Sequence, residues 1–172
     1  MKKTTLGITV VVVSFIILVF YYGLNTEKIY DTEDLVGKKI TEVEIDLFGK
    51  DGTFNTKEIS NYQFTLLNFW ASWCGPCRKE HKNLIKLSEN KNLKIIGINF
   101  KDDEINAKNF LKEMGNPFDI LTKDFKGKKA VNFGVYGIPE TILVNRKLII
   151  LKKYIGPLSS KDVNEIKKLI KK

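Results

Sequence analysis

Trp73-Cys74-Gly75-Pro76-Cys77 contains the only two cysteines of the 172-residue chain. An apolar run, Phe64 to Trp70, ends just before this stretch and is typical of a central strand that is covered on both faces. From Gly75 to about Asn90 the apolar positions follow a helical spacing. The two cysteines are therefore predicted to lie where a buried strand passes into a helix, and this junction decides the fold.

A Cys-x-x-Cys pair at the start of a helix has a defined chemistry. The N–H groups of the first turn and the positive end of the helix dipole stabilise a thiolate, which lowers the pKa of the first cysteine. We therefore expect Cys74 to attack a disulfide, and Cys77, which is more buried, to resolve the product by closing a Cys74–Cys77 disulfide. Pro76 suits the first turn because its missing N–H has no helical partner there. Two cysteines and one histidine, His81, are too few for a four-ligand zinc site of cysteine and histidine.

The rest of the soluble sequence predicts a hairpin, a β-α-β-α-β unit, a second hairpin and a final helix. Right-handed β-α-β crossovers make the central strands parallel, and the hairpins add antiparallel ones. The expected strands are 41–48, 53–59, 64–70, 93–100, 118–122, 140–144 and 148–154, and the expected helices begin near Gly75, near Asp102 and after Ser159 or Ser160, with one helical turn inside 124–134.

The N-terminus predicts a membrane anchor. Lys2 and Lys3 precede an uncharged apolar run of 19 residues, Leu6 to Leu24, which as a helix is about 28 Å long and matches the hydrocarbon core of a bilayer. No small-residue cleavage pattern follows, so an uncleaved signal anchor is favoured over a cleaved signal. The expected organisation is a cytoplasmic N-terminus (1–5), a single transmembrane anchor (6–24), a linker (25–39) and one domain (40–172). The positive-inside rule then places that domain outside the cytoplasm, in the periplasm if the membrane is a bacterial inner membrane.

The formal net charge of +9 comes almost entirely from lysines. They are scattered, with some clustering near the C-terminus, and the sequence shows no arginine-rich stripe with interleaved aromatic residues. Nucleic-acid binding is therefore not expected. A solvated soluble surface is the favoured interpretation, and weak attraction to an anionic membrane or an acidic partner stays open.

The stretch from Phe69 to Cys77, Phe-Trp-Ala-Ser-Trp-Cys-Gly-Pro-Cys, closely resembles the active site of thioredoxins. Further segments narrow the resemblance to the DsbE/CcmG group, the membrane-tethered thioredoxin-like proteins of cytochrome c maturation. The most specific of them is Phe-Gly-Val-Tyr-Gly-Ile-Pro-Glu-Thr at 133–141. The others lie at 77–81, 99–103 and 111–118, and the resemblance extends from about Val36 to the C-terminus.

This resemblance implies a fold, an activity and partners. The fold is an α/β thioredoxin-like one, a central mixed β-sheet flanked by helices, with an N-terminal β-hairpin extension. The implied activity is that of a protein-disulfide reductase, which passes electrons from a membrane thiol-disulfide carrier of the CcdA/DsbD type to the oxidised Cys-x-x-Cys-His sites of apocytochrome c. Haem-attachment assembly proteins are further implied partners, and no cofactor is expected.

The resemblance also implies which residues surround the cysteine pair. Pro139 is expected to be a cis-proline packed against the active site, and Glu80 and Glu140 are expected near the disulfide. Trp73, Gly75 and Pro76 complete the expected site.

Two positions depart from the resemblance. The pair between the cysteines is Gly-Pro, as in general thioredoxins, where many members of the group carry other residues. Asn68 stands where ordinary thioredoxins bury an aspartate. The proton acceptor for Cys77 must then come from elsewhere, and Glu80 and Glu140 are the candidates.

Simpler interpretations stay open for several of these residues. Glu80 is alternatively a solvated carboxylate on a helix, and Glu140 a surface residue at the start of a strand. His81 is predicted to lie on the helix surface without a ligand role. Two other functions also stay open, a general envelope thiol-disulfide exchanger and a non-catalytic scaffold that binds apocytochrome c, although two retained cysteines argue against a pure binding role.

Overall fold

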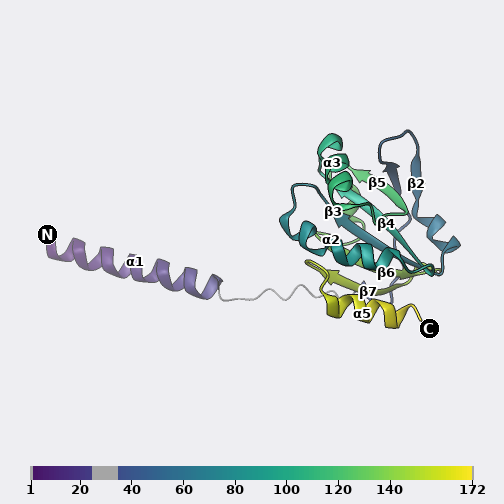
Figure 1. The fold of residues 1–172 in the computed structure, drawn as a ribbon. Helices are drawn as coiled ribbons and strands as arrows, with labels where there is room; N and C mark the ends of the chain where they lie inside the picture. Colours follow the sequence, from purple (N-terminus) through teal and green to yellow (C-terminus); the bar gives the residue numbers. More distant parts are fainter. Residues whose placement is uncertain (1, 25–34, 172) are drawn as a thin grey trace. The chain divides into compact units, whose positions relative to one another are not determined.

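The computed structural model describes residues 2–24 and 35–171 (Figure 1), so residues 25–34 of the predicted linker lie outside the described part of the chain. The first segment is one helix, α1 (Lys2–Leu24). Its stretch Thr4–Leu24 has a mean hydropathy of 2.4 and none of it is buried against protein. An apolar helix of this length is long enough to cross a bilayer and could anchor the protein in a membrane.

A mixed β-sheet forms the centre of residues 35–171, and within this range its order is β2-β1-β5-β4-β3-β6-β7 (Figure 1). The three central strands β5, β4 and β3 are parallel to one another. Antiparallel strands extend the sheet on both sides. The strand bounds are Glu44–Leu47 for β1, Thr53–Asn55 for β2, Phe64–Trp70 for β3, Leu93–Phe100 for β4, Ile120–Asp124 for β5, Glu140–Asn145 for β6 and Ile150–Ile155 for β7.

Helices connect and cover the central strands. α2 (Gly75–Ser88) joins β3 to β4, and α3 (Glu104–Met114) joins β4 to β5. α5 (Ser160–Leu169) follows β7 and lies beside α2 (Figure 1). The short α4 (Lys128–Val131) lies between β5 and β6. The order of elements predicted from the sequence is therefore confirmed, with both hairpins present.

Two hydrophobic clusters fill the two faces of the sheet. The first contains both cysteines and packs residues of α2, α3 and α5 onto one face, among them Leu84, Phe110 and Ile166. The second covers the opposite face with residues from β1, the segment before it and the region around α4, among them Ile45 and Phe133. β3 is buried at all of its residues because both clusters cover it. The cysteine pair therefore belongs to the face that carries α2 and α5.

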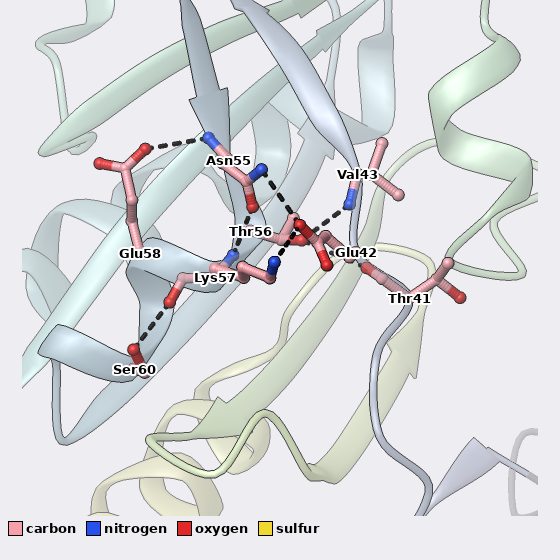
Figure 2. A network of polar contacts seen from close by, with 8 residues as sticks. All are labelled: Thr41, Glu42, Val43, Asn55, Thr56, Lys57, Glu58 and Ser60. Atoms are coloured by element: carbon pink, nitrogen blue, oxygen red, sulfur yellow. Dashed lines mark hydrogen bonds and ion pairs between the residues drawn. The ribbon is translucent and has the colours of Figure 1, made fainter.

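The predicted strand 53–59 is wrong beyond Asn55. At Asn55 the side-chain Oδ1 accepts the N–H of Lys57 at 2.9 Å, while the backbone N–H of Asn55 donates to Glu58 Oε1 at 3.0 Å (Figure 2). This reciprocal pair caps a 3-10 helix, η2 (Thr56–Asn61), whose first N–H groups have no partner inside the helix. Local side-chain capping thus ends the strand early.

The strand expected at 118–122 begins two residues later. The N–H of Phe118 donates to Asn116 Oδ1 at 3.0 Å instead of joining the sheet, and the Phe118 ring stacks on Trp70 with 5.4 Å between ring centroids. β5 then pairs with β1 in the antiparallel direction, Asp46 opposite Lys123. The N-terminal hairpin is therefore part of the central sheet.

Candidate active site

The two cysteines form a disulfide at the strand–helix junction that the sequence predicts. Cys74 is the N-cap residue of α2, and its Sγ accepts the N–H of Cys77 at 3.1 Å. The two Cα atoms are 5.3 Å apart. Both residues are buried, with exposed fractions of 4% for Cys74 and 2% for Cys77. A sulfur that already accepts a helix N–H is placed where a thiolate gains from the first turn and from the helix dipole.

An aspartate fixes the loop between β3 and the cysteines. The carboxylate of Asp102 accepts the backbone N–H of Ser72 at 2.6 Å and its hydroxyl at 2.7 Å. It also accepts from the Asn99 amide at 2.9 Å. Next to it, the indole N–H of Trp73 donates to the carbonyl of Lys101 at 3.0 Å, while 60% of the Trp73 surface stays exposed. The turn after β4 therefore holds the active-site loop and presents Trp73 to solvent beside the disulfide.

Glu80 lies one turn after Cys77 on the same side of α2, and it is 1% exposed. Its Oε1 accepts from Asn68 Nδ2 at 2.9 Å and its Oε2 from the N–H of Leu158 at 2.7 Å. Burial raises the pKa of the Glu80 carboxyl to about 7, and the hydrogen bonds from Leu158 and Asn68 offset part of that rise. The interpretation of Glu80 as a solvated helix carboxylate is therefore wrong.

Asn68 connects this carboxyl to the sheet. Its Nδ2 donates both to Glu80 and to Thr141 Oγ1, the latter at 3.0 Å. Its Oδ1 is buried and has no hydrogen-bond partner within residues 35–171. An asparagine cannot take up a proton as the aspartate of ordinary thioredoxins does, and Asn68 instead donates to the Glu80 carboxyl.

The loop before β6 carries the predicted cis-proline. The Ile138–Pro139 peptide bond is cis, and Ile138 packs against both hydrophobic clusters, one of which contains the cysteines. Glu140 follows directly and is 4% exposed. Its Oε1 accepts the N–H groups of Tyr136 at 3.1 Å and Gly137 at 3.0 Å. The carboxylate of Glu140 thus fixes the loop that presents Pro139, and its interpretation as a surface residue is wrong.

A buried lysine completes this arrangement. Lys153 Nζ lies 2.8 Å from Glu140 Oε2 as an ion pair and donates to the carbonyl of Gly134 at 2.5 Å. Glu140 and Lys153 face the second hydrophobic cluster, since Lys153 stands opposite Ile142 of that cluster. Glu80 belongs to the other face, with Cys77. The structure therefore separates the two candidate carboxyls, one on the cysteine face and one engaged with a lysine behind the sheet.

Comparison with known proteins agrees with this geometry. A family model described as Redoxin matches residues 35–170. The chain belongs to the redoxin family. This redoxin is 40% identical over 125 residues to the thiol:disulfide interchange protein HelX of Rhodobacter capsulatus, a match that covers 73% of the chain and 70% of HelX. It is 37% identical over 131 residues to DsbE of Haemophilus influenzae, covering 76% of the chain and 69% of that protein.

Solved structures support the fold. A Chlorobium tepidum structure described as a thiol:disulfide interchange protein DsbE has a TM-score of 0.67 at 24% identity, covering 78% of this chain and 94% of that one. StoA of Bacillus subtilis has a TM-score of 0.58 at 24% identity, covering 74% and 95%. The expected thioredoxin-like fold is confirmed, and the redoxin is a thiol:disulfide interchange protein of the DsbE/CcmG type.

The surface position predicted for His81 is wrong, because this residue is 2% exposed. Its Nε2 lies 2.9 Å from the carbonyl of Gly115 and donates to it, while its ring packs edge-on against Phe110 and Phe118. Burial lowers the pKa of the imidazole. His81 is therefore a neutral core residue that ties α2 of the redoxin to the end of α3.

Sequence reasoning missed Lys153 as a site residue. The spacing of Ile150 and Lys152 predicts that these two share a face and that Lys153 points the other way. The pairing of β6 and β7 shifts register between Leu143 and Val144, so that Ile150 pairs with Val144 and Lys152 with Leu143. This irregularity turns Lys153 to the face of Ile150. No signal in the sequence marks the bulge. The position of Asp102 predicts only the start of a helix, although its carboxylate accepts the N–H of Ser72 in the active-site loop.

Proposed function

We propose that this redoxin reduces the disulfide of apocytochrome c Cys-x-x-Cys-His sites, so that their thiols can take up haem. The observation that carries the proposal is the Cys74–Cys77 pair in the first turn of α2 with the buried Glu80 carboxyl one turn further on the same side. Two thiols supply the electrons, and a carboxyl with a pKa near 7 can exchange a proton at neutral pH. The substrate class comes from the resemblance to the DsbE/CcmG group.

The reaction is a pair of thiol-disulfide exchanges. In the reduced protein the Cys74 thiolate attacks one sulfur of the substrate disulfide, which forms a mixed disulfide and releases the other substrate sulfur as a thiolate. Cys77 then loses its proton and attacks Cys74 Sγ, which closes the Cys74–Cys77 disulfide and releases the second substrate thiolate. Two electrons have moved to the substrate, and the protons return to its thiolates. A second disulfide exchange with a membrane carrier restores both thiols.

Glu80 is the better candidate for the proton acceptor of Cys77. It shares a side of α2 with Cys77, and its raised pKa makes it a base of suitable strength. Glu140 already binds two backbone N–H groups and the ammonium of Lys153 behind the sheet. We therefore assign Glu140 to holding the Pro139 loop, with Pro139 and Trp73 flanking the substrate sulfur.

The same proposal includes the location of the protein in the cell and its partners. α1 anchors the chain once in the bacterial inner membrane with residues 1–5 in the cytoplasm, and the domain from residue 40 faces the periplasm. Its electron donor is a membrane thiol-disulfide carrier of the CcdA/DsbD type, and its further partners are proteins of haem attachment. The length and hydropathy of α1 and the resemblance to the DsbE/CcmG group support this placement.

One observation favours a second function. Gly75-Pro76 between the cysteines is the pair of general thioredoxins, which fits an envelope thiol-disulfide exchanger of wider substrate range. Deletion of the gene separates the two functions. The proposal predicts loss of covalently bound haem, restored by the wild-type chain and not by Cys74→Ser. Normal cytochromes c together with disturbed disulfides in other envelope proteins would contradict it and favour the exchanger.

A further inference from the structure

Asn83 is a buried amide for which the exchange chemistry described above has no use. It lies on α2 one turn after Glu80, and it is 4% exposed. Its neighbours Leu84 and Leu87 belong to the hydrophobic cluster of the cysteine face. Burying an amide among apolar side chains costs free energy unless hydrogen bonds inside the protein replace those to water. The presence of an amide here is therefore explained by the contacts that it makes.

The Asn83 side chain bonds to the backbone of Leu158, which lies between β7 and α5. Its Nδ2 donates to the Leu158 carbonyl at 2.8 Å. A carbonyl can only accept, so this contact fixes which end of the amide points at Leu158. The Oδ1 of Asn83 is buried and has no hydrogen-bond partner within the described part of the chain. Asn83 therefore acts here as a donor to Leu158.

Leu158 is bound by two side chains of α2. Its N–H donates to Glu80 Oε2 at 2.7 Å, while its carbonyl accepts from Asn83. Glu80 and Asn83 are three residues apart and therefore share a side of the helix. We call these three residues the Leu158 clamp. Leu158 is 3% exposed, and a buried backbone carbonyl needs a donor. Because Asn83 supplies that donor, it helps to keep the N–H of Leu158 directed at Glu80.

The segment that contains Leu158 also binds the cis-proline loop. The N–H of Gly156 donates to the carbonyl of Pro139 at 2.9 Å. Gly156 has a φ of +80°, in the left-handed region that favours glycine. Residues 156–158 are thus bonded to Pro139 at one end and to α2 at the other. The Leu158 clamp therefore connects the loop that carries Pro139 with the helix that carries Cys77.

We propose that Asn83 is a positioning residue for the resolving step, because it holds Leu158 with its N–H directed at the Glu80 carboxylate. The inference rests on the assignment of Glu80 as proton acceptor in the proposed function. In this step Cys77 gives its proton to the Glu80 carboxylate, and its thiolate forms the bond to Cys74 Sγ. The bond between Cys74 and the substrate breaks, and the substrate sulfur leaves with the electron pair of that bond.

The clamp acts on the proton affinity of Glu80. Burial raises the pKa of this carboxyl to about 7, and of the two hydrogen bonds that lower the pKa, the one from Leu158 has the larger effect. A hydrogen bond to the charged form of an acid stabilises that form. Weakening the bond from Leu158 should therefore raise the pKa of Glu80 further, and Asn83 is the side chain that holds this donor in place.

The titratable groups around Glu80 belong to α2, β7 and α5. Cys77 lies on the same side of α2, and in the oxidised protein it is held in the disulfide and does not titrate. The others bond to different partners, namely Arg78 to Glu113, His81 to Gly115, Tyr154 to Glu165 and Asp162 to Ser159. The titration of Glu80 in the oxidised protein therefore reports on the clamp.

Asn83→Leu tests the proposal, because leucine has the same branched shape as asparagine and no donor. The Leu158 carbonyl then loses its partner, and the N–H of Leu158 is held less firmly at Glu80. Carbon-13 NMR of the oxidised full chain in detergent micelles follows the Glu80 carboxyl, whose signal is identified by its loss in Glu80→Gln. We expect the midpoint of its titration to move upward by about one pH unit, since hydrogen bonds to charged groups are among the stronger ones.

The resolving step should change with this titration. The reduced chain is mixed rapidly with an oxidised Cys-x-x-Cys-His peptide, and acid quenching with mass spectrometry gives the rate at which the mixed disulfide disappears. Because the ionised form of Glu80 accepts the proton, this rate should rise with pH through about 7 in the wild type. In Asn83→Leu the rise should come at higher pH. Its rate should be several-fold lower below pH 7, and the two rates should converge at high pH.

Two further variants keep the test specific. Leu87→Val shortens a buried side chain of the same helix and cluster without touching the clamp. It should lower stability and leave both midpoints unchanged. If Asn83→Leu does not fold, Asn83→Ser takes its place. The hydroxyl of serine ends one bond short of the amide nitrogen, so this variant should also weaken the clamp and move both midpoints upward.

The outcomes separate a failure of the inference from a failure of the proposed function. An unchanged Glu80 midpoint in the Asn83 variant, or an equal shift in Leu87→Val, would overturn the inference. A Glu80 midpoint that moves while the rate profile stays fixed would overturn the assignment of Glu80 as proton acceptor, and the role of Asn83 in the resolving step with it. The first result is obtained on the oxidised protein alone and does not depend on any substrate.

Discussion

At the scale of single residues, the chemistry of the site depends on which side chains and backbone groups pack over α2. The spacing of Cys74 and Cys77 after an apolar run predicts their place at a helix start, which is confirmed. Whether a carboxyl on α2 is solvated depends on what packs over it, and Glu80 is covered by Leu158 from a segment 78 residues away. The surface position predicted for His81 is wrong for the same reason, because Phe110 of α3 and Phe118 of the following loop cover its ring.

The buried Glu80 makes stability depend on pH. Its pKa is raised from the ordinary 4.5 to about 7, so between these values the folded protein holds a proton that the unfolded chain has lost. The stabilising contribution is complete below about pH 4.5 and is lost as the pH rises through 7, by about 3 kcal/mol in total. Glu80→Gln removes this titration. The free energy of unfolding can be measured with urea for both oxidised chains in detergent micelles. Relative to the wild type, that of the variant should rise by about 3 kcal/mol from pH 4.5 to pH 8. A constant difference over that range would contradict the assignment.

At the scale of elements, side-chain contacts set the ends of helices and strands, and the apolar periodicity of the sequence does not predict these ends. β2 stops at Asn55 because the cap of η2 competes with the strand, and the bulge in β7 turns Lys153 inward. The helices were easier to predict, since apolar spacing and capping residues agree, as in Ser159 before α5. The ends of these elements thus depend on a few polar side chains, whose role can be recognised only once their hydrogen-bond partners are known.

The cap at Asn55 has a measurable effect. Asn55→Ala leaves the N–H of Lys57 without its acceptor and should lower the free energy of unfolding by about 1 kcal/mol. Ser60→Ala is a matched control in the same 3-10 helix, where an exposed hydroxyl donates to the carbonyl of Lys57, and it should change stability by less than about 0.5 kcal/mol. Equal effects of the two substitutions in urea unfolding would argue against the cap.

The ion pair of Lys153 and Glu140 joins β7, β6 and the loop before it. Lys153→Met leaves a buried carboxylate without its charge partner and should cost about 3–5 kcal/mol of stability. Adding Glu140→Gln removes the stranded charge while an amide oxygen still accepts from Tyr136 and Gly137. The double variant should therefore be more stable than Lys153→Met alone. If denaturant unfolding shows that the losses of stability caused by the two substitutions simply add in the double variant, the coupling between Lys153 and Glu140 is refuted.

At the scale of the whole molecule, the fold brings three separate segments to one end of the sheet. β3 delivers the cysteines, the loop before β6 delivers Pro139, and the turn after β4 fixes Ser72 through Asp102. The sequence predicts this order of elements because strands and helices alternate, and crossovers have a fixed hand. It does not predict that β1 pairs with β5, since strand partners between hairpins and a central sheet are set by packing.

The central claim is that Cys74 attacks a substrate disulfide and Cys77 resolves the product. The most direct measurement is the mass of the complex that each single-cysteine chain forms with an oxidised Cys-x-x-Cys-His peptide. Cys77→Ser should accumulate a mixed disulfide through Cys74, and Cys74→Ser should form little, because Cys77 is 2% exposed and lacks the place at the helix N-cap. An adduct through Cys77 in Cys74→Ser, with none in Cys77→Ser, would contradict the account.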